Sequence, residues 1–214
     1  MNKKLYIGID ASIKCTGITI FKDNNYYFYY YNSDKVAKIR KLTEDNFLYN
    51  FDIENFRIDN KLKIIEDKKD FSDTIYYSEK ADSIIKIINS YIDTNTEEII
   101  IGLEGYALGG MGMIFNIAEF CGLLKEKLYS KINHKNKTIY IFKPTNIKKF
   151  ATGKGNSKKP QMLKAFREIN SDTTNKLLDI FNINNDEYIK NIKSPVEDLV
   201  DSYFICKKIM VSYK

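Results

Sequence analysis

Residues 97–105 read EEIIIGLEG, and this stretch constrains the fold more than any other part of the chain. Its apolar residues are nearly continuous, a pattern typical of a strand that is buried on both faces of a sheet. The strand ends at an acid, Glu104. Because such a strand needs a layer of helices on each side, we expect a central sheet inside a layered α/β fold.

The segments around this strand predict the rest of the sheet and its helices. Three apolar segments near the N-terminus are expected to form an antiparallel meander, at residues 4–10, 15–21 and 26–32. Helices are expected from Ser78, as N-cap, to residue 93 and at about 113–131. A strand at 138–142 and a short turn follow, and the chain is mostly helical from Pro160 onward. The predicted sheet therefore has three antiparallel and two parallel strands, with helices on both faces.

Length and composition favour a single domain over residues 1–214, with an elaboration at about 33–77 where charges of both signs are mixed with apolar residues. The chain has 214 residues, of which 43% are hydrophobic and 14% aromatic, enough for a substantial core. No window approaches eighteen uninterrupted apolar residues, and Asp10 interrupts the N-terminal apolar stretch, so we expect a soluble, non-secreted, cytoplasmic protein. Three cysteines, far apart and each in an apolar pattern, indicate buried thiols in a reducing compartment.

The positive charge of the chain is concentrated in one segment. Between Glu126 and Glu168 there is no acidic residue, while the span holds eleven lysines and Arg167, a charge of +12. The whole chain carries only +6, so the remaining residues carry −6. A localised patch of this kind favours a polyanionic partner, and the alternative is a solvated lysine-rich surface.

Acidic residues recur where predicted elements begin or end. Asp10 ends the first strand and Glu104 ends the fourth, so neighbouring strands would bring both carboxylates to one edge of the sheet. In the last helix, Asp198 and Asp201 are three residues apart and share a face, whereas Glu197 is expected to point elsewhere. Each acid alone is compatible with a strand end or a helix cap, but the set indicates a site.

Four converging carboxylates need a counter-charge. Two unit charges about 4 Å apart repel by roughly 4 kcal/mol at an effective dielectric constant near 20. Oxygen ligands without histidine or cysteine favour Mg²⁺, for which Mn²⁺ can substitute, over zinc. Two such ions would activate a water molecule and stabilise the leaving oxygen of a phosphodiester. Beside the basic segment, the acids therefore predict a metal-dependent nuclease.

Four sequence blocks carry a family resemblance: IGIDASIKCTGITIF, IIIGLEGY, PTNIKKFATGKGNSKKPQM and EDLVDSYFI. In this order they resemble the RuvC family of Holliday junction resolvases, which belongs to the RNase H-like superfamily. The resemblance implies an RNase H-like mixed sheet and a homodimer, whose two-fold symmetry suits a four-way DNA junction. It also implies paired nicks that leave 5′-phosphate and 3′-hydroxyl ends. The elaboration and the composition look closer to viral or bacteriophage members, which would act in the cytoplasm of a host cell.

Residue by residue, the resemblance implies metal ligands at Asp10, Glu104, Asp198 and Asp201, which are also the catalytic acids. A further catalytic role is implied for Lys159, near the scissile phosphate. Lysines that grip the DNA backbone are implied in the same block, at Lys148, Lys149, Lys154 and Lys158.

Two features of these blocks have a second interpretation. Tyr106 is near the position of an aromatic residue that can stack on an unpaired base, and the alternative is a tyrosine that packs at a strand end. Gly153 and Gly155 bracket Lys154 and would let backbone amides and an ammonium group meet a phosphate together, and the alternative is a surface loop.

The same residues are compatible with other functions. A broader nuclease of this fold would cleave flaps and forks as well as four-way junctions. The first block also resembles the phosphate loop of actin-like ATPases and sugar kinases, but no second DxGxG-like loop follows, so we expect no nucleotide cofactor. A binding module without catalysis is disfavoured because all four acids are present.

Overall fold

The structure is a computed structural model that describes residues 3–32, 48–50, 65–66, 69–70, 72–105, 114–169, 171–181, 183 and 194–213. Most of the predicted elaboration, Tyr106 and most of the glycine-rich turn after Glu104 lie outside the described residues. Among the described residues, no helix combines the length and the apolar content needed to cross a bilayer.

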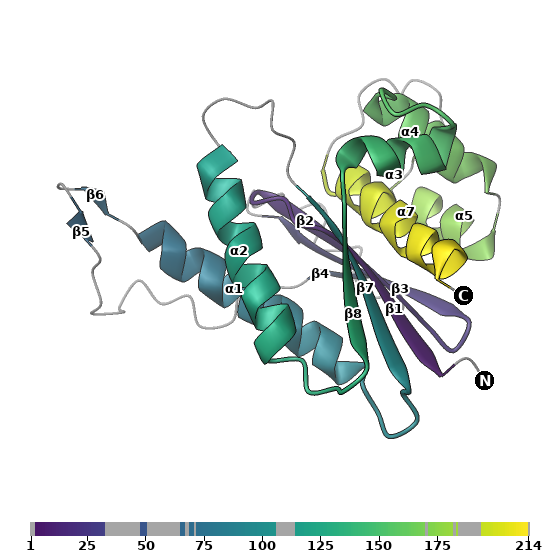
Figure 1. Cartoon of the computed structure of the whole chain (residues 1–214). Coiled ribbons are helices and arrows are strands. Elements are labelled where there is room, and N and C mark those ends of the chain that lie inside the picture. The colour runs from purple at the N-terminus through teal and green to yellow at the C-terminus, as the bar shows by residue number, and fades with distance from the viewer. Residues whose placement is uncertain are drawn as a thin grey trace.

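The central sheet has six strands in the order β4-β3-β2-β1-β7-β8 (Figure 1). Their bounds are β1 Lys4–Asp10, β2 Cys15–Lys22, β3 Asn25–Asn32, β4 Leu48–Asn50, β7 Glu98–Glu104 and β8 Lys137–Phe142. The first three strands pair antiparallel, and β7 and β8 continue the sheet in parallel with β1. This confirms the predicted mixed sheet, to which β4 adds a short edge strand parallel to β3.

Helices cover both faces of this sheet, as predicted (Figure 1). One face carries α1 (Ser72–Ser90) and α2 (Ile114–Ser130), and the other carries α3 (Pro144–Thr152), α4 (Lys159–Glu168), α5 (Asp172–Ile180) and α7 (Val196–Ser212). The strands β5 (Ile65–Glu66) and β6 (Lys69–Asp70) form a separate two-stranded sheet before α1.

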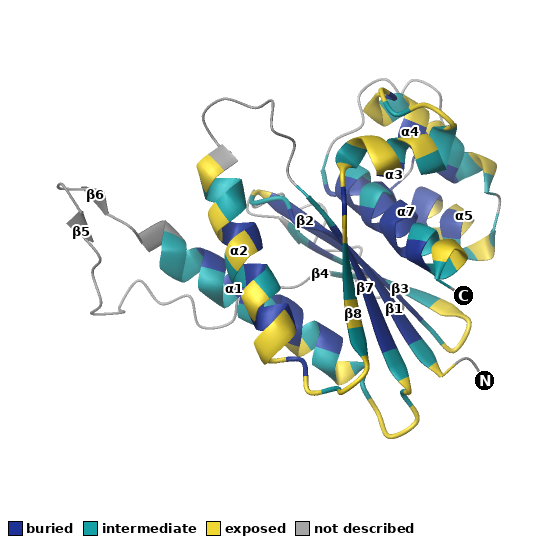
Figure 2. Ribbon diagram, in the orientation of Figure 1, coloured by how far each residue is buried: buried dark blue, intermediate teal, exposed yellow. Residues whose placement is uncertain are grey.

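Side chains that alternate along β1 and β7 enter two separate cores. Leu5, Ile7 and Ile9 of β1 pack with α1 and α2, while Tyr6 contributes to the core under α7. Full burial of each large apolar side chain contributes about 1.5–3 kcal/mol. The central strands are accordingly buried along nearly their whole length, as Figure 2 shows. This two-sided burial explains the continuous apolar run from which the fold class was predicted.

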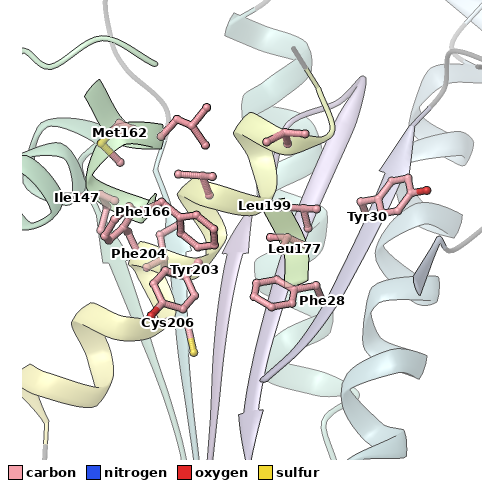
Figure 3. Packing of buried hydrophobic residues seen from close by; sticks show 14 of the residues in the cluster. Phe28, Tyr30, Ile147, Met162, Phe166, Leu177, Leu199, Tyr203, Phe204 and Cys206 are labelled. Carbon is pink, nitrogen blue, oxygen red and sulfur yellow. The ribbon is translucent and has the colours of Figure 1, made fainter. Parts of the chain in front are cut away.

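The core on the other face joins α7 to α3, α4 and α5. Its aromatic centre is Phe166 of α4 and Tyr203 and Phe204 of α7, which pack in edge-on contacts with ring centroids 5.0–6.3 Å apart (Figure 3). Phe28 of β3 stacks against Tyr203 with a centroid distance of 6.4 Å. These contacts fix α7, which carries two of the candidate acids, against the sheet.

The helix α7 lies unusually close to β1 because Gly8 has no side chain. A Cβ atom there would be 2.2 Å from the carbonyl oxygen of Ser202 and 2.5 Å from the amide nitrogen of Cys206. The hydroxyl groups of Thr19 and Ser202 form a buried hydrogen bond of 2.8 Å across the same contact. The position of α7 on the sheet is therefore set by backbone contact as well as by side-chain packing.

One predicted helix boundary is wrong, and one helix was not predicted. The helix α1 begins at Ser72, so Ser78 lies inside it rather than at its N-cap, and Tyr77 adds to its buried face. A turn was predicted between β8 and the last helices, where the structure has α3 instead. Pro144 stands in the first turn of α3, and Gly153, with φ of 80°, ends it.

Candidate functional site

Asp10 and Glu104 lie side by side at one end of the sheet. Ile9 of β1 is opposite Leu103 of β7 in the parallel register, so the next residue of each strand is an acid. Both strands point the same way, and their carboxyl ends meet at one edge. The structure thus brings together the two acids that were predicted to end neighbouring strands.

The first turn of α7 lies over the same edge. Gly17 of β2 pairs with Asp10, and a Cβ atom on Gly17 would be only 2.2 Å from the carbonyl oxygen of Asp198. Asp201 follows Asp198 by three residues and so lies on the same face of α7. The close contact at Gly17 brings the two helical acids to the strand-end acids.

The four carboxyl groups interact electrostatically. Burial raises the pKa of Asp10 well above its usual range, and the charges of Glu104, Asp198 and Asp201 raise it further. Burial also raises the pKa of Glu104 to about 7, that of Asp198 to about 6 and that of Asp201 to about 8. The site therefore holds acidic groups that water does not stabilise in their charged forms.

The donor set fits a hard divalent cation. The Oδ2 atom of Asp198 is buried without a hydrogen-bond partner, which leaves a lone pair available for an ion. The nearby Cys15 is buried and its pKa is raised, so it is a neutral thiol and not a thiolate ligand for a soft metal. Among the described residues, no three or more acidic, histidine or cysteine side chains are placed so that together they could hold a metal ion. The four carboxyl groups share one end of the sheet and would have to move closer together to bind one.

Two predicted lysines lie within electrostatic reach of the acids. Lys148 of α3 lowers the pKa of Glu104 and of Asp201, and Lys159 of α4 lowers that of Asp198 and of Asp201. Lys149, Lys154 and Lys158 are exposed on the same α3–α4 segment. The segment predicted to grip a DNA backbone is thus adjacent to the acids, although Lys148 and Lys149 lie in a helix rather than in a loop.

The sequence predicted that Glu197 points away from the site, and this prediction is wrong. One of its carboxylate oxygens is 2.5 Å from the Nζ atom of Lys159, and the other accepts a hydrogen bond of 3.1 Å from Ser194 Oγ. Glu197 is largely buried, whereas Lys159 is largely exposed. Glu197 therefore holds the ammonium group of Lys159 near the site, a role that its spacing from Asp198 and Asp201 in the helix does not reveal.

The basic segment is not a single patch. Lys127 of α2 and Lys131, which directly follows this helix, both contact Asp82 of α1, on the face of the sheet opposite α3 and α4. Lys137 donates to the carbonyl oxygens of Tyr129 and Ile132. The interpretation of one +12 surface is therefore wrong, and the basic residues beside the acids are those of α3, α4 and the turn between them.

Lys80 was missed by the sequence analysis. It lies in α1 in line with Ile84 and Ile88, at spacings of four, and like them it is completely buried. The helical periodicity places Lys80 among apolar residues on one face of the helix, and this position could have predicted its burial from the sequence.

Comparison with known proteins identifies the fold. No protein-family model matches the chain, and no curated protein matches it in sequence. The crystal structure of the yeast mitochondrial Holliday junction resolvase Ydc2 is similar over 97% of this chain and 77% of its own, with a TM-score of 0.50 and 12% identity. Thermus thermophilus RuvC, alone and in complex with a Holliday junction substrate, is similar over 94% of this chain and 90% of its own, with TM-scores of 0.43 and 0.42 and identities of 11% and 12%. The chain therefore shares its fold with the resolvase Ydc2, an α/β fold with a mixed central sheet and helices on both faces.

Proposed function

We propose that this protein is a divalent-cation-dependent endodeoxyribonuclease that resolves four-way DNA junctions. One observation carries the proposal: four buried or half-buried carboxyl groups from β1, β7 and α7 share one end of the sheet, beside the lysines of α3 and α4. This combination suits hydrolysis of a phosphodiester, because the acids can hold cations and the lysines can hold the DNA backbone. The similarity to the resolvase Ydc2 supports a junction as the substrate.

Each residue has a defined task in this proposal. Asp10, Glu104, Asp198 and Asp201 would hold two Mg²⁺ ions, or Mn²⁺ in their place. When bound, the ions supply the Lewis acidity that activates water and stabilises the leaving oxygen, giving 5′-phosphate and 3′-hydroxyl ends. Lys159, which Glu197 holds near the acids, would contact the scissile phosphate.

Lys148 orients the neighbouring phosphate from α3 and partly offsets the charge of Glu104 and Asp201. Lys149, Lys154 and Lys158 would bind the flanking backbone. The stacking role of Tyr106 stays a prediction, because this residue lies outside the described part of the chain.

A homodimer would supply the second incision. The outward face of α2 exposes Phe115 and Tyr129, with exposed fractions of 81% and 76%. Burying large aromatic side chains is favourable for association. A two-fold dimer through α2 would present two active sites to a junction of matching symmetry.

The proposal is tested by incubating the protein with Mg²⁺ and a panel of four-way, flap, fork and linear duplex DNAs. We expect paired nicks in the four-way junction and none in the linear duplex. If flaps and forks are cleaved as well as four-way junctions, the protein is a broader branched-DNA nuclease and not a junction-specific resolvase. No cleavage of any DNA with Mg²⁺ or Mn²⁺ would refute the nuclease.

The raised pKa values predict how stability depends on pH and on cations. A carboxyl group whose pKa is raised in the folded state stabilises the fold below its ordinary value, about pH 4, and that stabilisation is lost as the pH rises through the folded pKa. For Asp198, Glu104 and Asp201 the loss begins near pH 4 and is complete near pH 6, 7 and 8 respectively. We therefore expect the melting temperature of the cation-free protein to fall between about pH 4 and pH 8.

Added Mg²⁺ should reverse this loss, because it binds the ionised carboxylates of the folded state. Thermal unfolding with and without Mg²⁺ should show a larger increase in melting temperature at the alkaline end of the range than at the acidic end. An increase that is the same at both ends would contradict this arrangement of the acids.

The lysines of α3 and α4 predict the salt dependence of DNA binding. Each phosphate contact contributes about 0.9 to the slope of log K against log salt concentration. The double variant Lys149→Ala, Lys158→Ala should therefore reduce the magnitude of that slope by about 2. Lys131→Ala is the matched control, because Lys131 contacts Asp82 on the opposite face of the sheet. If the wild type, the double variant and Lys131→Ala all have the same slope, the DNA does not bind at the lysines of α3 and α4.

A further inference from the structure

A buried lysine lies behind the turn that follows Asp10. Lys80 of α1 has no exposed surface, and its Nζ atom donates hydrogen bonds to the carbonyl oxygens of Ser12 (3.0 Å) and Ile13 (2.7 Å). Both carbonyls belong to the turn between β1 and β2. Lysine is almost never fully buried unless its ammonium group is paired, so these two contacts explain how the fold accommodates Lys80.

Two aromatic rings also face the ammonium group, which interacts electrostatically with Asp10 and Asp198 as well. Its Nζ atom is 4.5 Å from the ring centroid of Tyr31 in β3 and 4.9 Å from that of Phe120 in α2. Aromatic faces attract a cation, and the attraction increases when water is excluded. Lys80 thus joins α1, α2 and β3 to one turn of the chain.

One of these two carbonyl oxygens also accepts a hydrogen bond from within the turn region. The carbonyl oxygen of Ser12 also accepts a hydrogen bond of 2.7 Å from the hydroxyl of Thr16. Thr16, at the start of β2, and Lys80, in α1, therefore both stabilise the turn by donating hydrogen bonds to its carbonyl oxygens. Asp10 is the last residue of β1 before this turn, and its strand partner Gly17 is the next residue after Thr16. A shift of the turn would move the Asp10 carboxylate.

We propose that Lys80 is a positioning residue: by binding the carbonyls of Ser12 and Ile13 it fixes the turn after Asp10 and holds the Asp10 carboxylate in place for cation binding. The inference rests on the proposed function, because it assigns Lys80 a role at the proposed metal site. It extends that site from the four acids to a residue on the opposite layer of helices.

Loss of Lys80 would have two effects of opposite sign. Removing a positive charge near carboxylates favours cation binding. Loosening the turn disfavours cation binding, and each hydrogen bond lost is worth about two- to tenfold in an equilibrium constant. Since two such bonds are lost, the positioning role predicts weaker binding, whereas a role of charge alone predicts tighter binding.

The experiment compares Lys80→Met with Lys127→Met in the full chain without DNA. Lys127 is the matched control, because it is also buried, with an exposed fraction of 6%, but it pairs with Asp82 at 2.6 Å and does not contact the turn. The measurements are Mn²⁺ affinity by electron paramagnetic resonance and amide hydrogen exchange of residues 11–16 by mass spectrometry.

For Lys80→Met we expect Mn²⁺ binding to weaken about tenfold and exchange in residues 11–16 to quicken about tenfold, with both values near wild type for Lys127→Met. Equal changes in the two variants, or tighter Mn²⁺ binding by Lys80→Met, would overturn the proposal. If Lys80→Met does not fold, Thr16→Val removes the other donor to the same carbonyl, and unchanged Mn²⁺ affinity in that variant would also overturn it.

Neither measurement requires cleavage, so the two proposals can fail separately. A wild-type protein that binds Mn²⁺ but cuts no DNA would refute the nuclease alone. A wild-type nuclease whose Lys80 and Lys127 variants behave alike would refute the positioning role alone.

Discussion

Asp10→Asn is expected to reduce Mg²⁺-dependent cleavage on the order of 10³-fold, because the substitution removes a charged ligand while keeping the shape of the side chain. Asp10 is the acid whose pKa responds to all three of its partners, so it is central to the cluster. Binding of a four-way junction should persist in a gel-shift assay, since the lysines of α3 and α4 are unchanged. If Asp10→Asn still cleaves the junction, Asp10 is not a ligand of the catalytic cations.

The same substitution should stabilise the protein when cations are absent. A buried carboxylate that repels its neighbours opposes folding at neutral pH, and an amide does not. The metal-free Asp10→Asn protein should therefore melt at a higher temperature than the wild type at about pH 8, while gaining less from added Mg²⁺.

Asp93→Asn is the matched control for this variant. Asp93 lies 2.5 Å from the Nζ atom of Lys22, and this pair lowers its pKa to about 2. Its loss should leave cleavage unchanged and should not stabilise the protein. A stability gain for Asp93→Asn equal to that for Asp10→Asn would show that repulsion within the acid cluster is not the cause.

The sheet could be predicted because its signal is local. The apolar runs of β1 and β7 follow from burial on both faces, and each acid at a strand end is visible in the same few residues. The convergence of Asp10 and Glu104 then follows from the pairing of parallel strands. The register itself, with Ile9 opposite Leu103, was not available from the sequence.

The features that were missed depend on partners far away in the sequence. Glu197 meets Lys159, and Lys80 meets the turn at Ser12, through contacts that the spacing within one helix does not determine. The helix α3 was missed for a different reason: the segment that follows Pro144 is rich in lysine and polar residues, and only Ile147 is buried. Its helical state depends on packing against α4 and α7 more than on its own pattern.

Gly17→Ala is expected to damage the site without touching any acid. The added Cβ atom would be 2.2 Å from the Asp198 carbonyl oxygen and 2.5 Å from the carbonyl carbon, and both are backbone atoms that cannot rotate away. Relief of this clash requires the first turn of α7 to move by roughly 1 Å, a misplacement that can cost about 10²-fold in rate. Overpacking of this kind also destabilises a protein by about 1–3 kcal/mol.

Gly122→Ala is the matched control, because nothing lies within 4 Å of the Cβ position at Gly122 in α2. Alanine there should stabilise the helix by up to about 1 kcal/mol and leave the Mg²⁺ concentration for half-maximal cleavage unchanged. Because Gly122 shares the outward face of α2 with Phe115 and Tyr129, this variant is a control for the acid site and not for dimer formation. The measurements are thermal unfolding, junction binding and the Mg²⁺ concentration that gives half-maximal cleavage. Gly17→Ala should raise that Mg²⁺ concentration while junction binding persists. Wild-type cleavage by Gly17→Ala would mean that Asp198 is not held in place by its contact with β2, and Asp198 would then lose its place among the proposed ligands.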